Sequence, residues 1–101
     1  MTVLVWTESA RRDLRAIRSY VSRDSKTYAK RLIDRIRRKA EGVLRLPRAA
    51  AIVPEWGREN VRETFVANYR VIYRIRDDFV EVLAVIHAAR LLPDADDVVP
   101  E

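Results

Sequence analysis

The segment Tyr69–His87 decides the fold of this 101-residue chain; it reads YRVIYRIR, then DD, then FVEVLAVIH. Apolar residues alternate with polar ones on both sides of the Asp pair, which is typical of β-strands. We predict a hairpin around the Asp pair, with one apolar face toward the core. The proposed register pairs Ile75 with Val80, Tyr73 with Val82, Val71 with Ala84 and Tyr69 with Ile86 on that face, and Arg74 with Glu81 and Ile72 with Leu83 on the other.

Two more strands are predicted before this hairpin. Val61–Val66 has the same strand-like pattern, and its register stays open because the turn at residues 66–68 can hold two or three residues. Ala50–Pro54 is predicted as an edge strand, since proline is tolerated at sheet edges.

The first half of the chain has helical spacing instead. Apolar residues recur at steps of three and four, which predicts a helix over Glu8–Ser22 with Thr7 as its N-cap. A break at residues 23–25 separates it from a second helix that ends at Pro47. The residues before the first helix, Val3–Trp6, are predicted as a strand.

This order of elements predicts an α+β fold: an N-terminal strand, an αα-hairpin, then antiparallel strands in one sheet with the helices packed on one face. We assign residues 1–93 to a single domain, because the length leaves no room for a second core. Residues 94–101 hold four acidic residues, so we expect an extended acidic arm outside the core.

Composition excludes several kinds of chemistry. With no Cys and one His, zinc sites, iron–sulfur clusters and thiol nucleophiles are not expected, and we predict neither a metal nor a cofactor. The two glycines form no phosphate-binding loop. The N-terminal segment lacks the basic region of a signal peptide, and no apolar run reaches the ~18 residues of a membrane span. We therefore expect an intracellular protein with no membrane contact.

The positive charge is concentrated in the first half. Residues 1–50 hold 14 Lys and Arg against five Asp and Glu, residues 51–92 hold six against six, and residues 93–101 hold none against four. On the first helix, Arg11, Arg15 and Arg18 lie one above the other. This stripe indicates an anionic partner, either nucleic acid or an acidic protein segment; the alternative is a solvated helix face.

A second group of polar residues is predicted on the strands. Arg62, Arg70, Arg74, His87 and Arg90 lie on strands or strand ends, and the predicted alternation places Arg70, Arg74 and His87 on the face away from the core. Such a set could cleave RNA without a metal, because Arg stabilises phosphorane charge while His moves protons. The alternative is structural: Arg74 pairs with Glu81, Arg70 packs over Val85, and His87 caps a strand end.

Five segments stand in a characteristic order along residues 3–93. They are Trp6-Thr7-Glu8 followed by Ala10, Asp13-Leu14, Ile17 and Tyr20; the long helix ending at Pro47; Val61-Arg62-Glu63; Asn68–Arg74; and His87-Ala88-Ala89-Arg90. Together they resemble the ParE branch of the RelE/ParE superfamily, the toxins of type II toxin–antitoxin modules. The resemblance implies the same α+β fold. It also implies a cognate antitoxin with a ribbon-helix-helix DNA-binding domain and an acidic C-terminal segment.

The superfamily has two activities. RelE-like members are ribosome-dependent mRNA endonucleases that use basic residues and a late Tyr, whereas ParE-like members poison DNA gyrase and are linked to plasmid stabilization. This chain has no Lys after Lys39 and no Tyr after Tyr73, so we favour a toxin of the bacterial cytoplasm that binds gyrase and is not an enzyme. The partner or target contacts would be Arg11, Arg15, Arg18, Arg62, Arg70, Arg74, His87 and Arg90.

Two alternatives stay open. One is a RelE-type, metal-independent mRNA endonuclease acting at the ribosome, with Arg62, His87 and Arg90 as catalytic candidates. The other is a non-toxic remnant that only binds its antitoxin.

Overall fold

A computed structural model describes residues 3–101. Met1 and Thr2, which begin the segment that lacks a signal-peptide pattern, lie outside the described residues. The elements are β1 (Leu4–Trp6), α1 (Glu8–Ser22), α2 (Lys26–Gly42), two short 3-10 turns (Val43–Arg45 and Pro47–Ala49), β2 (Ala51–Ile52), β3 (Val61–Val66), β4 (Tyr69–Ile75), β5 (Val80–His87) and α3 (Ala95–Val98).

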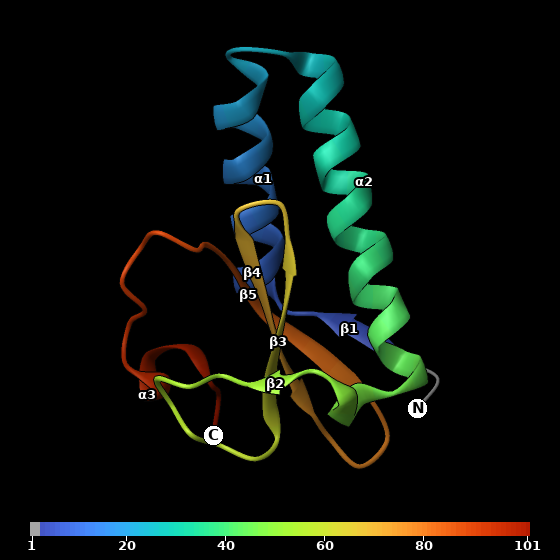
Figure 1. Cartoon of the computed structure of the whole chain (residues 1–101), viewed down its shortest axis with the longest axis vertical. Helices are drawn as coiled ribbons and strands as arrows, with labels where there is room; N and C mark the ends of the chain where they lie inside the picture. The colour runs from blue at the N-terminus through green and yellow to red at the C-terminus, as the bar shows by residue number, and fades with distance from the viewer. Residues whose placement is uncertain (1–2) are drawn as a thin grey trace.

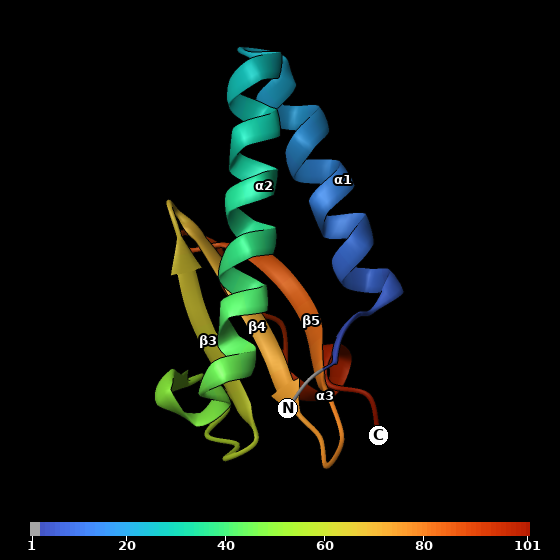
Figure 2. The ribbon, with the colours of Figure 1, turned by 90° about the vertical axis from the view of Figure 1, so that its right-hand side faces the viewer.

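The strands form one sheet in the order β1-β5-β4-β3-β2. β1 runs parallel to β5, and every other pair is antiparallel. The hairpin of α1 and α2 packs on one face of this sheet, and its tip extends beyond the strands (Figures 1 and 2). The predicted fold class is therefore confirmed. No helix within residues 3–101 is long and apolar enough to span a bilayer.

Capping explains where the two long helices begin. The Thr7 hydroxyl accepts a hydrogen bond from the backbone N–H of Ala10 at 3.1 Å, and Ser25 does the same for Tyr28 at 3.1 Å. α1 has the predicted bounds. The α-helical part of α2 ends earlier than predicted, at Gly42, and the 3-10 turns continue the chain past Pro47 to β2.

The turn between β3 and β4 settles the register that the sequence left open. Val66 pairs with Tyr69, so the turn has two residues, and Ala67 takes a left-handed conformation with φ of 50°. Val66 then packs toward the helices, whereas Phe65 is exposed. The edge of β3 therefore carries a large aromatic side chain.

The β4–β5 hairpin departs from the predicted register halfway along. Ile75, Arg74 and Tyr73 pair with Val80, Glu81 and Val82 as predicted, but an extra residue then shifts β5 by one position. The predicted pairs Ile72–Leu83, Val71–Ala84 and Tyr69–Ile86 are wrong; the observed pairs are Ile72–Ala84, Val71–Val85, Arg70–Ile86 and Tyr69–His87.

The physical reason is a β-bulge, which re-aims the side chains that follow it. Val82 and Val85 both pack in the core beneath the helices, while Leu83 and Ala84 both pack in a second core on the opposite face. His87 consequently lies beside Tyr69 on the helix side, and its predicted place beside Arg70 and Arg74 is wrong.

The second core explains why the C-terminal segment is not an extended arm. Residues 94–101 include α3, and Val99 is 7% exposed among Val53, Ile72 and Leu83. The acidic side chains do not enter this core: Asp96, for example, forms an exposed ion pair with Arg58 at 2.7 Å. Our expectation that these residues stay outside the core was wrong because two valines supply the apolar contact.

Replacing Val99 by Ala should lower the free energy of unfolding by roughly 1–2 kcal/mol, because it removes buried methyl groups. The matched control is Leu91→Ala, since Leu91 is 96% exposed and should change stability by less than ~0.5 kcal/mol. Urea denaturation of both variants measures the difference. Equal stabilities would show that the C-terminal segment is not part of the cooperative core.

Candidate functional site

Arg62 is a structural residue at the start of β3. Its buried guanidinium donates hydrogen bonds of 2.9 Å to the carbonyl oxygens of Glu59, Arg48 and Ala50. It also contacts the Glu59 carboxylate at 2.9 Å. These bonds fix the loops that enter β2 and β3. They also occupy the guanidinium N–H donors of Arg62 that a phosphate would need.

The other two strand arginines are held in buried ion pairs on the face opposite the helices. Arg70 donates to Glu63 at 2.7 Å and to Glu55 at 2.6 and 2.8 Å. The hydrogen bonds from Arg70 lower the pKa of Glu55 to about 2. Arg74 binds Glu81 at 2.6 Å, which is the structural pairing that the sequence suggested.

His87 and Arg90 come together at a cavity of about 490 Å³ between α1 and the ends of β4 and β5. The rings of His87 and Tyr69 meet edge to face, with centroids 5.2 Å apart. His87 Nδ1 accepts the backbone N–H of Ala89 at 3.1 Å, and the Arg90 N–H donates to the His87 carbonyl at 3.0 Å. This turn holds the His87 ring and the Arg90 backbone beside each other.

Helix α1 forms the remaining side of the cavity. Asp13 Oδ2 accepts the backbone N–H of Val85 at 2.9 Å; burial raises the pKa of this carboxyl, and the Val85 hydrogen bond and then the positive charge of Arg90 oppose the rise. Tyr20 also lines the cavity and is 66% exposed. The spacing of Asp13, Ile17 and Tyr20 by four and three residues could have placed all three on one helix face.

Arg62 does not belong to this cavity. It pairs with Tyr73 on β4, whereas His87 pairs with Tyr69. Four residues along a strand separate the two positions by roughly 13 Å. The three catalytic candidates from the sequence therefore do not form one cluster, and only His87 and Arg90 share a surface. That surface offers aromatic contact, one cation and a half-buried carboxylate.

The arginine stripe of α1 is exposed but partly neutralised. Glu8 binds Arg15 at 3.0 Å and Arg11 at 3.4 Å, and these hydrogen bonds lower the pKa of Glu8. Arg18 forms no ion pair within residues 3–101. All three side chains border a small hollow that Arg37 of α2 closes.

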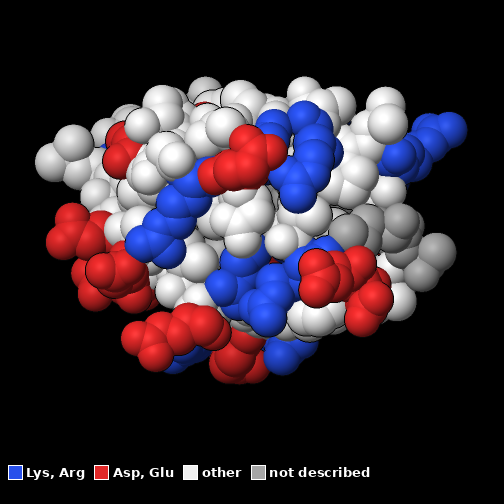
Figure 3. Space-filling model, turned by 90° about the horizontal axis from the view of Figure 1, so that it is seen from below, with Lys and Arg blue, Asp and Glu red and all other residues white. Residues whose placement is uncertain are grey.

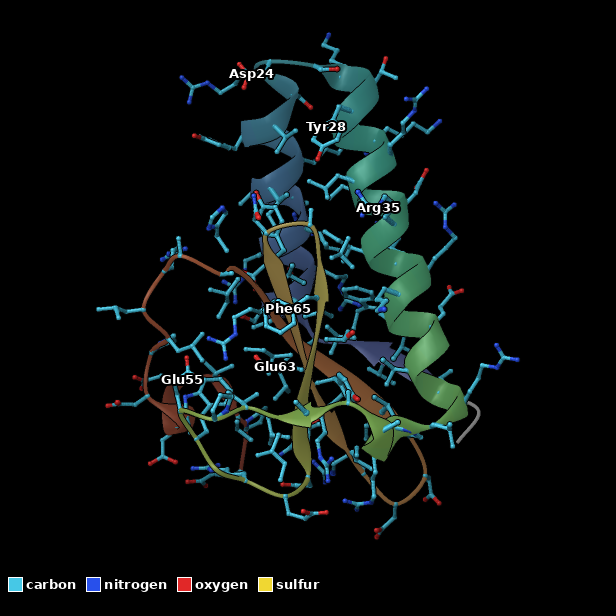
Figure 4. The ribbon with its side chains drawn as sticks, in the orientation of Figure 1. Asp24, Tyr28, Arg35, Glu55, Glu63 and Phe65 are labelled. Atoms are coloured by element: carbon cyan, nitrogen blue, oxygen red, sulfur yellow. The ribbon has the colours of Figure 1, made fainter. Side chains whose placement is uncertain are left out.

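A second basic surface lies on α2, where we had singled out no candidate. Arg35, Arg38 and Lys39 border a hollow of about 400 Å³ together with Phe65 and the β3–β4 turn. Figure 4 shows Arg35 on α2 and Phe65 on the neighbouring strand. The helical spacing of the cations was visible in the sequence, but their proximity to the edge of β3 depends on the tertiary fold.

An αα-hairpin packed on one face of a small mixed sheet is also the fold of two solved structures that are described below. Residues 4–92 match the family described as ParE toxin of type II toxin-antitoxin system, parDE, and the chain belongs to this family. It is similar to Toxin RelE2 of Caulobacter vibrioides, with 33% identity over 91 residues that cover 90% of this chain and 100% of the relative. The chain is thus a toxin of the type II toxin–antitoxin class.

Two solved structures share the fold. The chromosomal ParDE toxin–antitoxin system from P. aeruginosa superimposes with a TM-score of 0.72 at 21% identity, covering 86% of this chain and 96% of that chain. A mutant of the E. coli toxin RelE in the free state gives 0.63 at 21% identity, covering 87% and 84%. Both branches of the superfamily are therefore structurally close to this chain.

The ion pair between Glu55 and Arg70 should make the protein sensitive to acid. Because the pKa of Glu55 falls from 4.5 to about 2 on folding, its stabilising contribution is complete above about pH 4.5 and is lost as the pH falls toward 2. We expect Glu55→Gln to reduce the fall of the urea midpoint between about pH 5 and pH 2.

Glu41→Gln is the control, because Glu41 is exposed and forms no ion pair within residues 3–101. If both variants keep the acid dependence of the unmodified protein, the Glu55 carboxylate does not gain stability from Arg70.

Proposed function

We propose that this toxin inhibits growth by binding DNA gyrase, and that a ribbon-helix-helix antitoxin with an acidic C-terminal segment neutralises it in the bacterial cytoplasm. The main observation behind this proposal is that the arginines on the strands are already bound to other groups of the protein. Arg62, Arg70 and Arg74 are held by carboxylates and backbone carbonyls, which leaves them poorly placed to stabilise the charge of a cleaved phosphodiester. The match to the parDE family supports the same conclusion.

The cavity beside His87 is the proposed contact with the target. Tyr20, Tyr69 and His87 offer aromatic surface, and Arg90 adds an exposed cation at its rim. Aromatic residues and arginine dominate the binding energy of many protein interfaces. A binding toxin needs such a surface and does not need a proton relay.

The double substitution His87→Ala/Arg90→Ala should abolish toxicity without unfolding the protein, because both side chains are at least partly exposed. With purified gyrase, supercoiled plasmid and ATP, the unmodified toxin should trap cleaved DNA. The variant should need at least about 10-fold more protein for the same effect. Leu91→Ala, which alters an exposed neighbour, is the control.

Full activity of the double variant would show that the cavity does not contact the target. If the unmodified toxin traps no cleaved DNA, the gyrase proposal is contradicted.

A ribosome-dependent mRNA endonuclease is the second candidate, favoured by the 33% identity to a relative named Toxin RelE2. The chemistry would then fall to His87 as the proton-transfer group and Arg90 as the cation. Pulse labelling after induction separates the two candidates: early loss of translation indicates the endonuclease, whereas DNA damage with continuing translation indicates gyrase. Harmless expression without antitoxin would indicate a non-toxic remnant.

The α1 stripe is proposed to speed the approach of the acidic antitoxin. Charges at the edge of an interface mainly change association rates. Replacing Arg11, Arg15 and Arg18 by Glu should therefore slow association by about 3–10-fold at low ionic strength and leave dissociation nearly unchanged. At about 0.5 M salt the difference should disappear, because exposed charges are screened. Stopped-flow measurements test this, and an unchanged rate would identify a solvated face.

A further inference from the structure

A small hollow between α1 and α2 is lined by arginines from both helices. Arg11, Arg15 and Arg18 follow one another along α1 at steps of four and three residues, which places them on one face of that helix. Arg37 reaches the same hollow from α2, which lies side by side with α1 (Figures 1 and 2). The packing of the helical hairpin therefore brings four guanidinium groups to one place.

The floor of this hollow is apolar. Leu14 of α1 and Ile33 of α2 line it and are 5% and 6% exposed. Because this floor excludes water on one side, charges in the hollow are screened less than charges that are fully exposed. The volume is about 110 Å³, against about 490 Å³ for the His87 cavity, so the hollow admits a small anionic group and not a folded segment.

Positive charge in the hollow exceeds the negative charge that pairs with it. Among the described residues, Glu8 is the single carboxylate that binds the lining arginines, and it is shared between Arg11 and Arg15. Neither Arg18 nor Arg37 forms an ion pair within residues 3–101. Like charges three or four residues apart on a helix repel one another. A bound anion would relieve this repulsion.

We propose that the hollow is a binding site for a phosphate group, held between the two helices by Arg18 and Arg37, with Arg11 and Arg15 adding charge beside it. The planar fork of a guanidinium group matches phosphate, which it binds through two parallel hydrogen bonds. Phosphate oxygens are arranged tetrahedrally, so arginines on two helices can bind different oxygens. The oxygens of a carboxylate lie in one plane and suit this arrangement less well.

This site goes beyond the proposed role of the α1 stripe in attracting the antitoxin. Attraction at a distance depends on the summed charge and needs no fixed ligand. A phosphate site saturates and depends on the shape of the guanidinium group. Two sources offer the same chemical group: a small phosphorylated molecule and the backbone of a nucleic acid.

The first test compares two pairs of substitutions that remove the same charge. Arg18→Gln/Arg37→Gln alters the hollow, and Arg35→Gln/Arg38→Gln alters arginines of α2 that border a different hollow. All four side chains are exposed, so both variants should fold. The probe is inorganic pyrophosphate, titrated by calorimetry at constant ionic strength.

We expect the Kd for pyrophosphate to rise at least about 10-fold in Arg18→Gln/Arg37→Gln, because charge-assisted hydrogen bonds are lost. It should rise less than about 3-fold in Arg35→Gln/Arg38→Gln, where only a screened charge at a distance is removed. Equal changes would show attraction to the general positive surface and would overturn the proposal.

The second test keeps the charge and changes its geometry. Arg18→Lys/Arg37→Lys should weaken pyrophosphate binding at least about 5-fold, because lysine lacks the planar fork of donors. The same variant should associate with the antitoxin, purified as the protein encoded beside the toxin gene, at the rate of the unmodified toxin, because the net charge is unchanged. Undiminished pyrophosphate binding would overturn a site built on guanidinium geometry.

Competition separates the possible ligands. If a double-stranded DNA oligomer displaces pyrophosphate, and Arg18→Gln/Arg37→Gln loses both, the source of the phosphate is nucleic acid. If pyrophosphate binds and DNA does not compete, the source is a small phosphorylated molecule. If a glutamate-rich peptide binds through Arg18 and Arg37 and pyrophosphate does not bind, the hollow takes a protein carboxylate and the proposal is overturned.

These measurements are independent of the proposed function. Binding of pyrophosphate requires neither gyrase nor toxicity, so its failure would contradict the phosphate site alone. A harmless toxin, or one that traps no cleaved DNA, would contradict the proposed function and leave the phosphate site in place.

Discussion

The bulge at Leu83 in β5 is the constraint on which the arrangement of the whole sheet depends. Two hydrogen bonds hold the bulge in place. The hydroxyl of Thr7, the N-cap of α1, donates to the Val82 carbonyl at 2.9 Å, and the Asp13 carboxylate in α1 accepts the Val85 N–H at 2.9 Å. Because of the bulge, β5 supplies apolar side chains to both faces of the sheet. The face opposite the helices must therefore also be shielded from water, and the C-terminal segment covers it. It also brings His87 round to the helix side.

The buried ion pairs on the far face fix that cover in place. Burying charged groups costs several kcal/mol per ion unless partners satisfy them, and no described buried side-chain nitrogen or oxygen lacks a hydrogen-bond partner. Arg74 binds both Glu81 and the carbonyl of Pro100, which joins the C-terminal segment to the middle of the sheet. Such directional bonds act together with the apolar pattern and the turn to fix one register of this valine-rich hairpin.

The sequence predicted what depends on local patterns and missed what depends on contacts between distant residues. Helix periodicity and the Thr7 cap predicted α1 to the residue. The bulge was missed because the run VEVLAVI is apolar enough to satisfy either register. The C-terminal segment was wrongly predicted to lie outside the core, because its four acidic residues dominate its composition. Val98 and Val99 nevertheless pack in the second core. The sequence singled out His87 and Arg90 as candidates, but Asp13 and Tyr20 come beside them only through the packing of α1.

The acidic C-terminal residues leave the positive field of the helical hairpin largely intact. Their segment packs on the far side of the sheet, where Asp96 pairs with Arg58. Seen from below, the molecule carries charges of both signs (Figure 3). Exposed charges separated by more than about 8 Å interact little at physiological ionic strength, so this segment contributes little screening over α1 and α2. The field is therefore available to an acidic partner, and the two helices can use it differently. The α1 stripe, which borders no strand edge, suits attraction at a distance, and Arg35, Arg38 and Lys39 extend the positive surface along α2.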